Sequence, residues 1–198
     1  MPYRNTVVGL LTASTLVVLG ACSDANTATP QVIFDGTLTI TGTQSSTVCT
    51  ENGGGLTVGD FGNLAASPPT GSAAVKDGDT FLGTQASVAC SVASAGNATF
   101  NVSATVDLAG TAGGVFRIDG QFNTTGQQTG IHAYFARRTS GNSYDETDRL
   151  CTVDYTTSFQ GVAAGRVWGH LNCPNAVDTA NAHACTIVAD FRFENCGQ

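Results

Sequence analysis

The sequence is poor in charged side chains, and its basic residues never form a run. Asp, Glu, Lys and Arg make up 12% of the 198 residues, whereas an average soluble domain carries about 25%. The net charge is −7, and the one adjacent basic pair is Arg137 and Arg138. Because proteins bind a phosphate backbone through clustered Lys and Arg, we expect no nucleic-acid partner.

The motifs of the common catalytic and metal sites are also missing. The sequence has no G-x-S-x-G or S-x-x-K pattern for a serine nucleophile, no H-E-x-x-H and no C-x-x-C. Thiol catalysis is excluded as well if the cysteines pair with one another. We therefore expect a protein that is not an enzyme and has no metal and no cofactor.

The apolar run near the N-terminus is too short to span a bilayer. Residues 6–19 carry no charge, but a transmembrane helix needs about 20 apolar residues. The run follows the single basic side chain of Arg4 and has the length of the apolar core of a signal peptide. We expect residues 1–21 to be a signal peptide.

Leu-Gly-Ala at positions 19–21 and Cys22 follow this run directly. The segment resembles the lipobox of bacterial lipoproteins. The resemblance implies that the signal is cut just before Cys22 and that this residue receives a diacylglyceryl thioether and an acylated amine, which makes the membrane a partner of the chain. The Asp stands at position 24 rather than 23, which favours the outer membrane of the cell envelope over the inner one. Residues 22–31 are then a lipidated, flexible tether.

Six cysteines follow the tether. An even number in an exported domain predicts three disulfides, for which fifteen pairings exist. These six residues are Cys49, Cys90, Cys151, Cys173, Cys185 and Cys196.

Strand geometry narrows the pairing. Residues 186–194 have the pattern of one strand, whose ends lie about 30 Å apart, so Cys185 and Cys196 cannot bond to each other. A polar loop between Cys173 and Cys185 favours a bond that closes it. We therefore expect three bonds: Cys173–Cys185, Cys49–Cys90 and, by elimination, Cys151–Cys196.

Apolar and polar residues alternate with a period of two in several segments. This pattern predicts strands with one buried face, and the Gly, Asn and Asp clusters between the segments predict turns. We expect an all-β fold, an antiparallel β-sandwich of jelly-roll-like topology with about eight to ten strands, over residues 32–198. Helix is expected only near residues 176–184. The clearest alternating segments are 32–41, 100–108, 116–122, 153–159 and 187–194.

Two of the expected strands carry imidazole and aromatic side chains at alternate positions. His132 precedes Tyr134 by two residues, and Trp168 precedes His170 by two. These four side chains are a candidate ligand patch on an exposed sheet face, because an aromatic ring there can stack on a sugar. Outward-facing polar residues without any ligand fit the same pattern.

Two groups of carboxylates have the residue types of a calcium site but not the spacing of an EF-hand loop. We interpret both as solvated turns. They are Asp77 with Asp79, and Asp145, Glu146 and Asp148 in the sequence SYDETD.

Together these features favour a lipid-anchored, extracytoplasmic module with a structural or binding role, whose partner is a glycan, an apolar ligand or an envelope protein. One alternative is a carrier of a lipid or other apolar ligand, which needs a cavity between the sheets. Another is a hydrolase acting on a glycan or an ester, with Asp154, His132 or His170 as the residues to test. The C-terminal segment, with Trp168 and residues 191–196, resembles uncharacterised small cysteine-containing lipoproteins of myxobacteria. This resemblance implies a protein class and a cellular location but no activity.

Overall fold

The computed structural model describes residues 28–40, 45, 48–66, 70–178 and 180–198. In these residues twelve strands form one antiparallel sheet, and there is no helix. Eight of the strands are long: β1 (Gln31–Thr39), β5 (Thr84–Gly96), β6 (Thr99–Leu108), β7 (Gly114–Asn123), β8 (Gln128–Arg137), β9 (Ser143–Asp154), β11 (Arg166–Asp178) and β12 (His183–Glu194). Four are short: β2 (Gly55–Val58), β3 (Val75–Lys76), β4 (Thr80–Phe81) and β10 (Gly161–Ala163).

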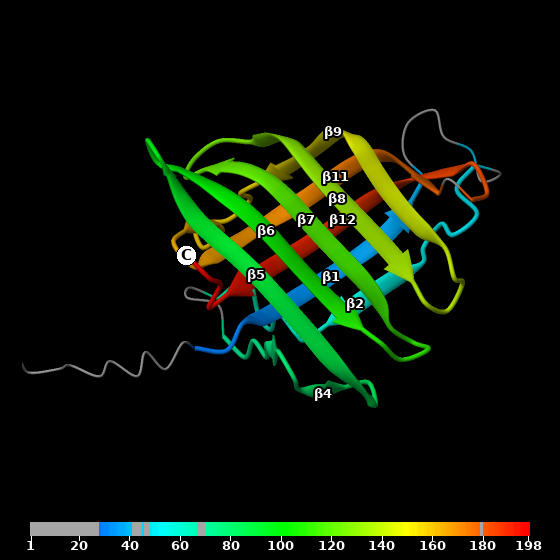
Figure 1. The fold of residues 1–198 in the computed structure, drawn as a ribbon, viewed down its shortest axis with the longest axis horizontal. Helices are drawn as coiled ribbons and strands as arrows, with labels where there is room; N and C mark the ends of the chain where they lie inside the picture. The colour runs from blue at the N-terminus through cyan, green and yellow to red at the C-terminus, as the bar shows by residue number, and fades with distance from the viewer. Residues whose placement is uncertain (1–27, 41–44, 46–47, 67–69, 179) are drawn as a thin grey trace, which may run out of the picture.

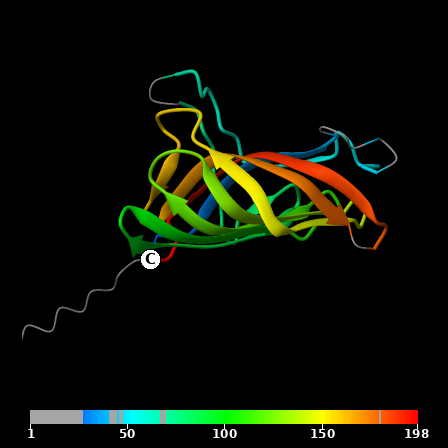
Figure 2. The same ribbon diagram turned by 90° about the horizontal axis from the view of Figure 1, so that it is seen from above.

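The long strands pair in nearly the order in which they follow one another in the chain. The sheet runs β2-β1-β12-β11-β9-β8-β7-β6-β5-β4, with β10 beside β11 and β3 beside β1. Figure 1 shows that β5 to β8 form one layer, which crosses β11, β12 and β1 at a steep angle. The view from above in Figure 2 shows the sheet curving round so that the two layers face each other.

Strand β5 does not remain an open edge. The amide of Val92 donates to the carbonyl of Gly197 at 2.8 Å, and Gly165 donates to the carbonyl of Val92 at 3.2 Å. Farther along β5, the amide of Val88 donates to the carboxylate of Asp77 at 2.8 Å, next to β3, which itself pairs with β1. The sheet is therefore nearly closed and barrel-like, with backbone groups along the β5 edge bonded.

The expected two-sheet sandwich of jelly-roll-like topology is not confirmed. Alternation along a strand reports which face is buried, but it does not report which strand lies alongside. A single sheet that curves onto itself buries one face in the same pattern as a sandwich does. The twelve strands exceed the expected eight to ten, because the pattern along the chain does not reveal the four short ones, which have two to four residues each.

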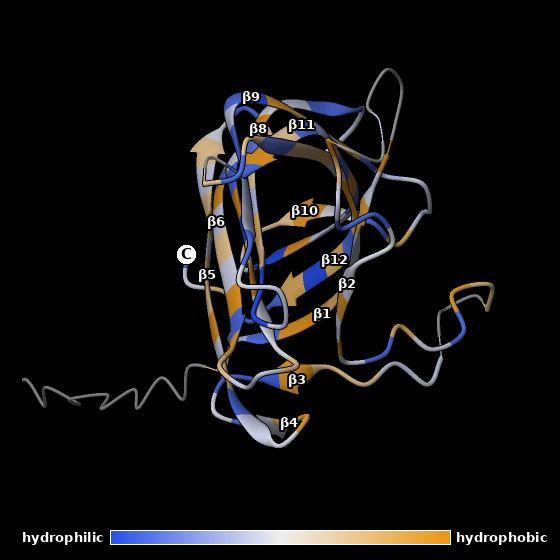
Figure 3. Cartoon of the chain, turned by 90° about the vertical axis from the view of Figure 1, so that its right-hand side faces the viewer, coloured by the Kyte–Doolittle hydropathy of each residue, from blue (hydrophilic) through white to orange (hydrophobic). Residues whose placement is uncertain are grey.

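Aromatic rings fill the interior between the two layers. Phe34 from β1 stacks on Phe116 from β7 with ring centroids 4.3 Å apart, and Phe135 from β8 lies 6.0 Å from Phe34. Phe191 and Phe193 from β12 complete the cluster. Figure 3 shows hydrophobic and hydrophilic residues alternating along the strands around this core, as the sequence predicts.

The described residues contain three disulfides, the expected number, but the expected pairing is wrong. The bonds are Cys49–Cys185, Cys90–Cys196 and Cys151–Cys173. Cys151 and Cys173 lie next to the paired residues Thr152 and Asn172 of the neighbouring strands β9 and β11, a relation that depends on the sheet order. Cys185 instead lies opposite Ala176 on β11, so the bond proposed between Cys173 and Cys185 has no geometric basis.

The segment expected to be helical extends a hairpin. Ala176, Val177 and Asp178 continue β11 and pair with Cys185, Ala184 and His183 at the start of β12. Pairing with a neighbouring strand decides the conformation here, because helix propensity is a weak preference that tertiary contacts override. The strand expected at 153–159 is also shorter than predicted, since β9 ends at Asp154.

The expected N-terminal features fall almost entirely outside the described residues. The expected signal peptide at residues 1–21, the expected lipidation site Cys22 and most of the expected tether at 22–31 lie outside the described residues. The last tether residue, Gln31, already belongs to β1. In the part of the chain that is described, no helix is long and apolar enough to cross a membrane.

Candidate functional site

The four residues of the predicted patch lie on the outer face of the sheet, in two groups. His132 and Tyr134 are on β8, and Trp168 and His170 are on β11, with β9 between the two strands. Their neighbours along each strand, such as Ala133 and Phe135, are buried inside. The alternation of apolar and polar residues therefore correctly predicts that these side chains lie on the outer face. Because the two groups are on different strands, each is described below with its own neighbours.

His132 joins three strands through its two ring nitrogens. Nδ1 lies 2.6 Å from a carboxylate oxygen of Asp119 on β7, and Nε2 lies 2.7 Å from a carboxylate oxygen of Asp145 on β9. Arg149 approaches the other oxygen of Asp119 at 3.0 Å, from the bulge that follows Glu146 in β9. Because only a protonated imidazole donates from both nitrogens, this arrangement favours the charged form of His132.

The ionisation of both groups follows from these contacts. Burial on its own lowers the pKa of His132, but the hydrogen bonds to Asp119 and Asp145 outweigh it and raise that pKa above its ordinary value of 6.5. Burial likewise raises the pKa of Asp119, but its bonds to His132 and Arg149 prevail and lower it below 3.8. With both nitrogens engaged, His132 has no lone pair for acid–base chemistry. Its side chain instead links β8 to β7 and β9.

The hydrogen bonds of His132 to Asp119 and Asp145 make the stability of the protein depend on pH. A histidine whose pKa is raised by folding stabilises the protein below its unfolded pKa, and the contribution is lost as the pH rises through the folded pKa. We expect His132→Gln to lower the Tm by about 2–4 °C near pH 5.5, which corresponds to about 1 kcal/mol. Near pH 8.5 the difference from the unsubstituted protein should shrink. Calorimetry at both pH values checks this, and an equal difference at both would contradict it.

Trp168 is covered rather than open to a ligand. Its side chain is on the outer face, yet the residue is only 4% exposed. The ring of Phe61, from the segment after β2, stacks on it with centroids 6.1 Å apart, and the guanidinium of Arg192 lies 5.4 Å from its ring centroid. Little of the indole surface remains exposed for a sugar ring to stack on. The alternation of apolar and polar residues along β11 does not reveal the segment that covers Trp168.

The acidic residues of the sequence SYDETD belong to strand β9 rather than to a turn. Glu146 points inward and is 2% exposed, and its carboxylate accepts the amides of Asp148 at 3.2 Å and Leu150 at 2.9 Å. It lies beside Cys151 and Cys173 in a group with the residue types of a metal site. Both sulfurs are in a disulfide, so Glu146 instead holds the bulge of β9 in place.

The other carboxylate pair, Asp77 and Asp79, does form a turn. Asp79 accepts the amide of Lys76 at 2.8 Å, and Asp77 accepts the amide of Val88 at 2.8 Å. Side chains of this type commonly satisfy the backbone of a tight turn in this way. Both residues therefore stabilise the turn between β3 and β4, and Asp77 also links this turn to β5.

A buried polar cluster closes one end of the sheet. The carboxylate of Glu51 lies 3.8 Å from the guanidinium of Arg137 and accepts a hydrogen bond from the amide of Asn142. Burial, followed by the charges of Glu51 and Asp178, raises the pKa of Tyr144. The sequence gives no signal for this cluster, because Glu51 lies in the connection between β1 and β2, whereas Arg137, Asn142 and Tyr144 lie in and beside the turn between β8 and β9.

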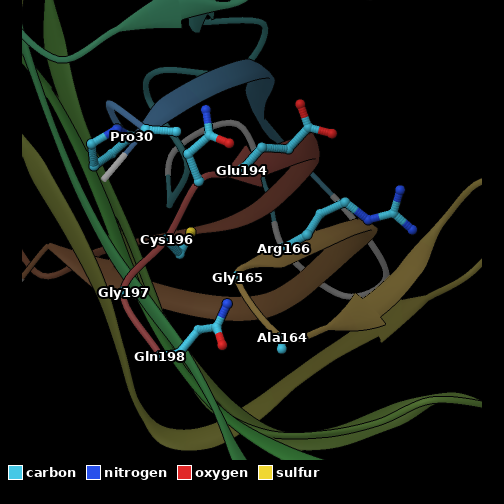
Figure 4. A pocket seen from close by; sticks show the side chains of 10 residues that line it. Pro30, Ala164, Gly165, Arg166, Glu194, Cys196, Gly197 and Gln198 are labelled. Atoms are coloured by element: carbon cyan, nitrogen blue, oxygen red, sulfur yellow. The ribbon is translucent and has the colours of Figure 1, made fainter. Parts of the chain in front are cut away.

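A surface pocket of about 700 Å³ lies where the first and last described segments meet (Figure 4). Arg166 and Glu194 are opposed on β11 and β12 at its rim, and Gly197 and Pro30 contribute to its lining. Glu194 accepts the amide of Gln31 at 2.8 Å, whereas the guanidinium of Arg166 has no carboxylate partner within the described ranges. As far as the described residues go, the pocket therefore offers one engaged carboxylate and one guanidinium without a carboxylate partner to a small polar ligand.

The chain shows no likeness from which a function could be transferred. Comparisons with protein-family models, with curated proteins and with solved structures found no match. The disulfide-bonded sheet, its filled interior and the groups on its outer face are therefore the features that indicate what the protein does.

Proposed function

We propose that the chain is a lipid-anchored, extracytoplasmic lipoprotein of the bacterial cell envelope, at the outer membrane, and a non-enzymatic module that binds its partner through the outer surface of the sheet. The observation that carries the proposal is the set of three disulfides. Two of them join residues 136 and 106 positions apart. Disulfides persist in oxidising compartments and are rare in the cytosol, which agrees with the signal peptide and the lipobox-like Cys22.

The filled interior supports a role for the outer surface. Rings from both layers, including Phe34, Phe116 and Phe193, meet between the layers and are fully buried. A ligand that entered this space would have to displace closely packed side chains, which is unfavourable. The outer face, in contrast, carries partly exposed polar side chains such as His170. The pocket beside Arg166 is also open to a ligand from outside.

The state of His132 supports a function without catalysis. A general base needs a free lone pair within reach of the substrate. Both ring nitrogens of His132 face carboxylates, at 2.6 and 2.7 Å. The carboxylate of Glu146 is likewise occupied by backbone amides of its own bulge.

Metabolic labelling with radioactive palmitate tests the anchor. We expect the full chain, expressed in a bacterium with lipoprotein processing, to incorporate the label and to sediment with membranes. Cys22→Ala should abolish labelling completely, because it removes the sulfur that receives the lipid. Ser23→Ala is the matched control and should label like the unsubstituted chain. An unlabelled natural chain, or label retained in Cys22→Ala, would contradict the proposal.

A further inference from the structure

Four polar side chains form a straight row across the outer face of the sheet. Asp35 on β1 lies opposite Asp190 on β12, Asp190 lies opposite His170 on β11, and His170 lies opposite Asp154 on β9. All four alternate with buried residues and therefore point outward. Three carboxylates and one imidazole thus share a single row.

Among the described residues, one side chain orients the imidazole of His170. Its Nδ1 lies 3.0 Å from a carboxylate oxygen of Asp190. Because a carboxylate accepts hydrogen bonds, Nδ1 carries the proton in the neutral ring and the lone pair is on Nε2. Among the described side chains, none bonds to this Nε2, and the side chain is 33% exposed. His132 differs, because both of its nitrogens are occupied.

The carboxylate on the other side of His170 is also held in position. The side-chain amide of Gln127 donates to the two carboxylate oxygens of Asp154, at 2.9 and 3.2 Å. Directly opposed residues of neighbouring strands have Cβ atoms about 5 Å apart. A carboxylate oxygen retains further lone pairs when it accepts one amide. Asp154, which opposes His170 from the strand on the side away from Asp190, therefore keeps lone pairs with which to bind a cation.

We propose that Nε2 of His170 and the carboxylate of Asp154 bind a divalent transition-metal ion on the outer face of the sheet. Metal-bound histidines commonly donate their other N–H to a carboxylate, and metal-bound carboxylates are hydrogen-bonded in turn. Asp190 and Gln127 supply these two supporting contacts. An imidazole ligand favours Zn²⁺ and Cu²⁺ over Ca²⁺ and Mg²⁺.

The charges around the row favour a cation. Asp35 and Asp190 are like charges at opposed positions, an arrangement that costs stability unless a cation is near. The basic residue two positions along β12, Arg192, already contacts Glu194 at 3.5 Å and the ring of Trp168. Two protein ligands leave the remaining metal positions to water or to a group of a binding partner. This site is independent of the lipid anchor proposed above.

Titration of the purified full chain, with its disulfides intact, tests the site. Calorimetry with Zn²⁺ should show one saturable ion, and Cu²⁺ should bind more tightly, with an electron paramagnetic resonance signal split by one imidazole nitrogen. We expect His170→Gln to abolish this binding, Asp154→Asn to weaken it at least tenfold, and Asp190→Asn to weaken it by about 10–100-fold. His132→Gln is the matched control and should leave the affinity unchanged.

Several results would overturn the proposal. They are the absence of saturable Zn²⁺ binding, unchanged binding in His170→Gln, an equal loss in His132→Gln, or displacement of Zn²⁺ by equimolar Ca²⁺, which would indicate a merely acidic surface. Circular dichroism of each variant separates loss of binding from loss of structure. If His170→Gln fails to fold, the Asp154→Asn affinity and the single-nitrogen Cu²⁺ signal of the natural chain decide the outcome.

Discussion

Replacing Phe116 by alanine is expected to lower the free energy of unfolding by about 3–5 kcal/mol. Phe116 is 0% exposed, and its ring on β7 lies 4.3 Å from that of Phe34 on β1 and 6.1 Å from that of Phe191 on β12. It therefore joins the two layers at their centre. Removing the ring leaves a cavity that the surrounding strands, fixed by their hydrogen bonds, can close only in part.

Denaturant unfolding of Phe116→Ala measures this loss. The matched control is Leu150→Ala, since Leu150 is 53% exposed on the bulge of β9 and a surface change of this kind usually costs less than about 0.5 kcal/mol. A loss below about 1 kcal/mol in Phe116→Ala would mean that the interior is not filled in the way described above. The slope of the transition should stay the same in all three proteins.

Removing the bond between Cys49 and Cys185 is expected to cost about 5 kcal/mol, more than removing the bond between Cys151 and Cys173. The two residues are 136 positions apart in the chain, and the entropy that a cross-link removes from the unfolded chain grows with the length of the loop it closes. The bond between Cys151 and Cys173 spans only 22 positions. Its removal should cost about 3 kcal/mol on the same basis.

The two double alanine variants, compared by denaturant unfolding under oxidising conditions, check this order. Each variant removes two buried sulfurs, so the comparison cancels most of the packing loss. Equal losses, or a larger loss for the shorter loop, would show that native-state packing rather than loop closure determines the contribution of these bonds.

The sequence predicts the face of each strand better than the neighbour of each strand. Phe116 and Ile118 alternate with Arg117 and Asp119, and all four point as the period of two requires. Alternation is a local property that a burial pattern imposes directly. The partner of Cys49 cannot be predicted in this way. It depends on the start of β12 lying next to the segment that follows β1, and an alternating pattern along the chain does not show which segments are neighbours.

The candidate sites show the same division. The outward position of His132 and of His170 follows from alternation, and both are on the outer face. The carboxylates that meet them, including Asp119 and Asp190, come from other strands, and only the register brings them within 3.0 Å. Trp168 also points outward, but the covering ring of Phe61 comes from a segment without any periodic pattern.

Mass spectrometry of the natural protein, purified from bacterial envelopes without reduction, tests the central claim most directly. Proteolytic peptides should show Cys49 joined to Cys185, Cys90 to Cys196 and Cys151 to Cys173, and the first peptide should begin at Cys22 with acyl chains attached. An intact leader together with six free thiols would contradict both the compartment and the anchored, oxidised sheet.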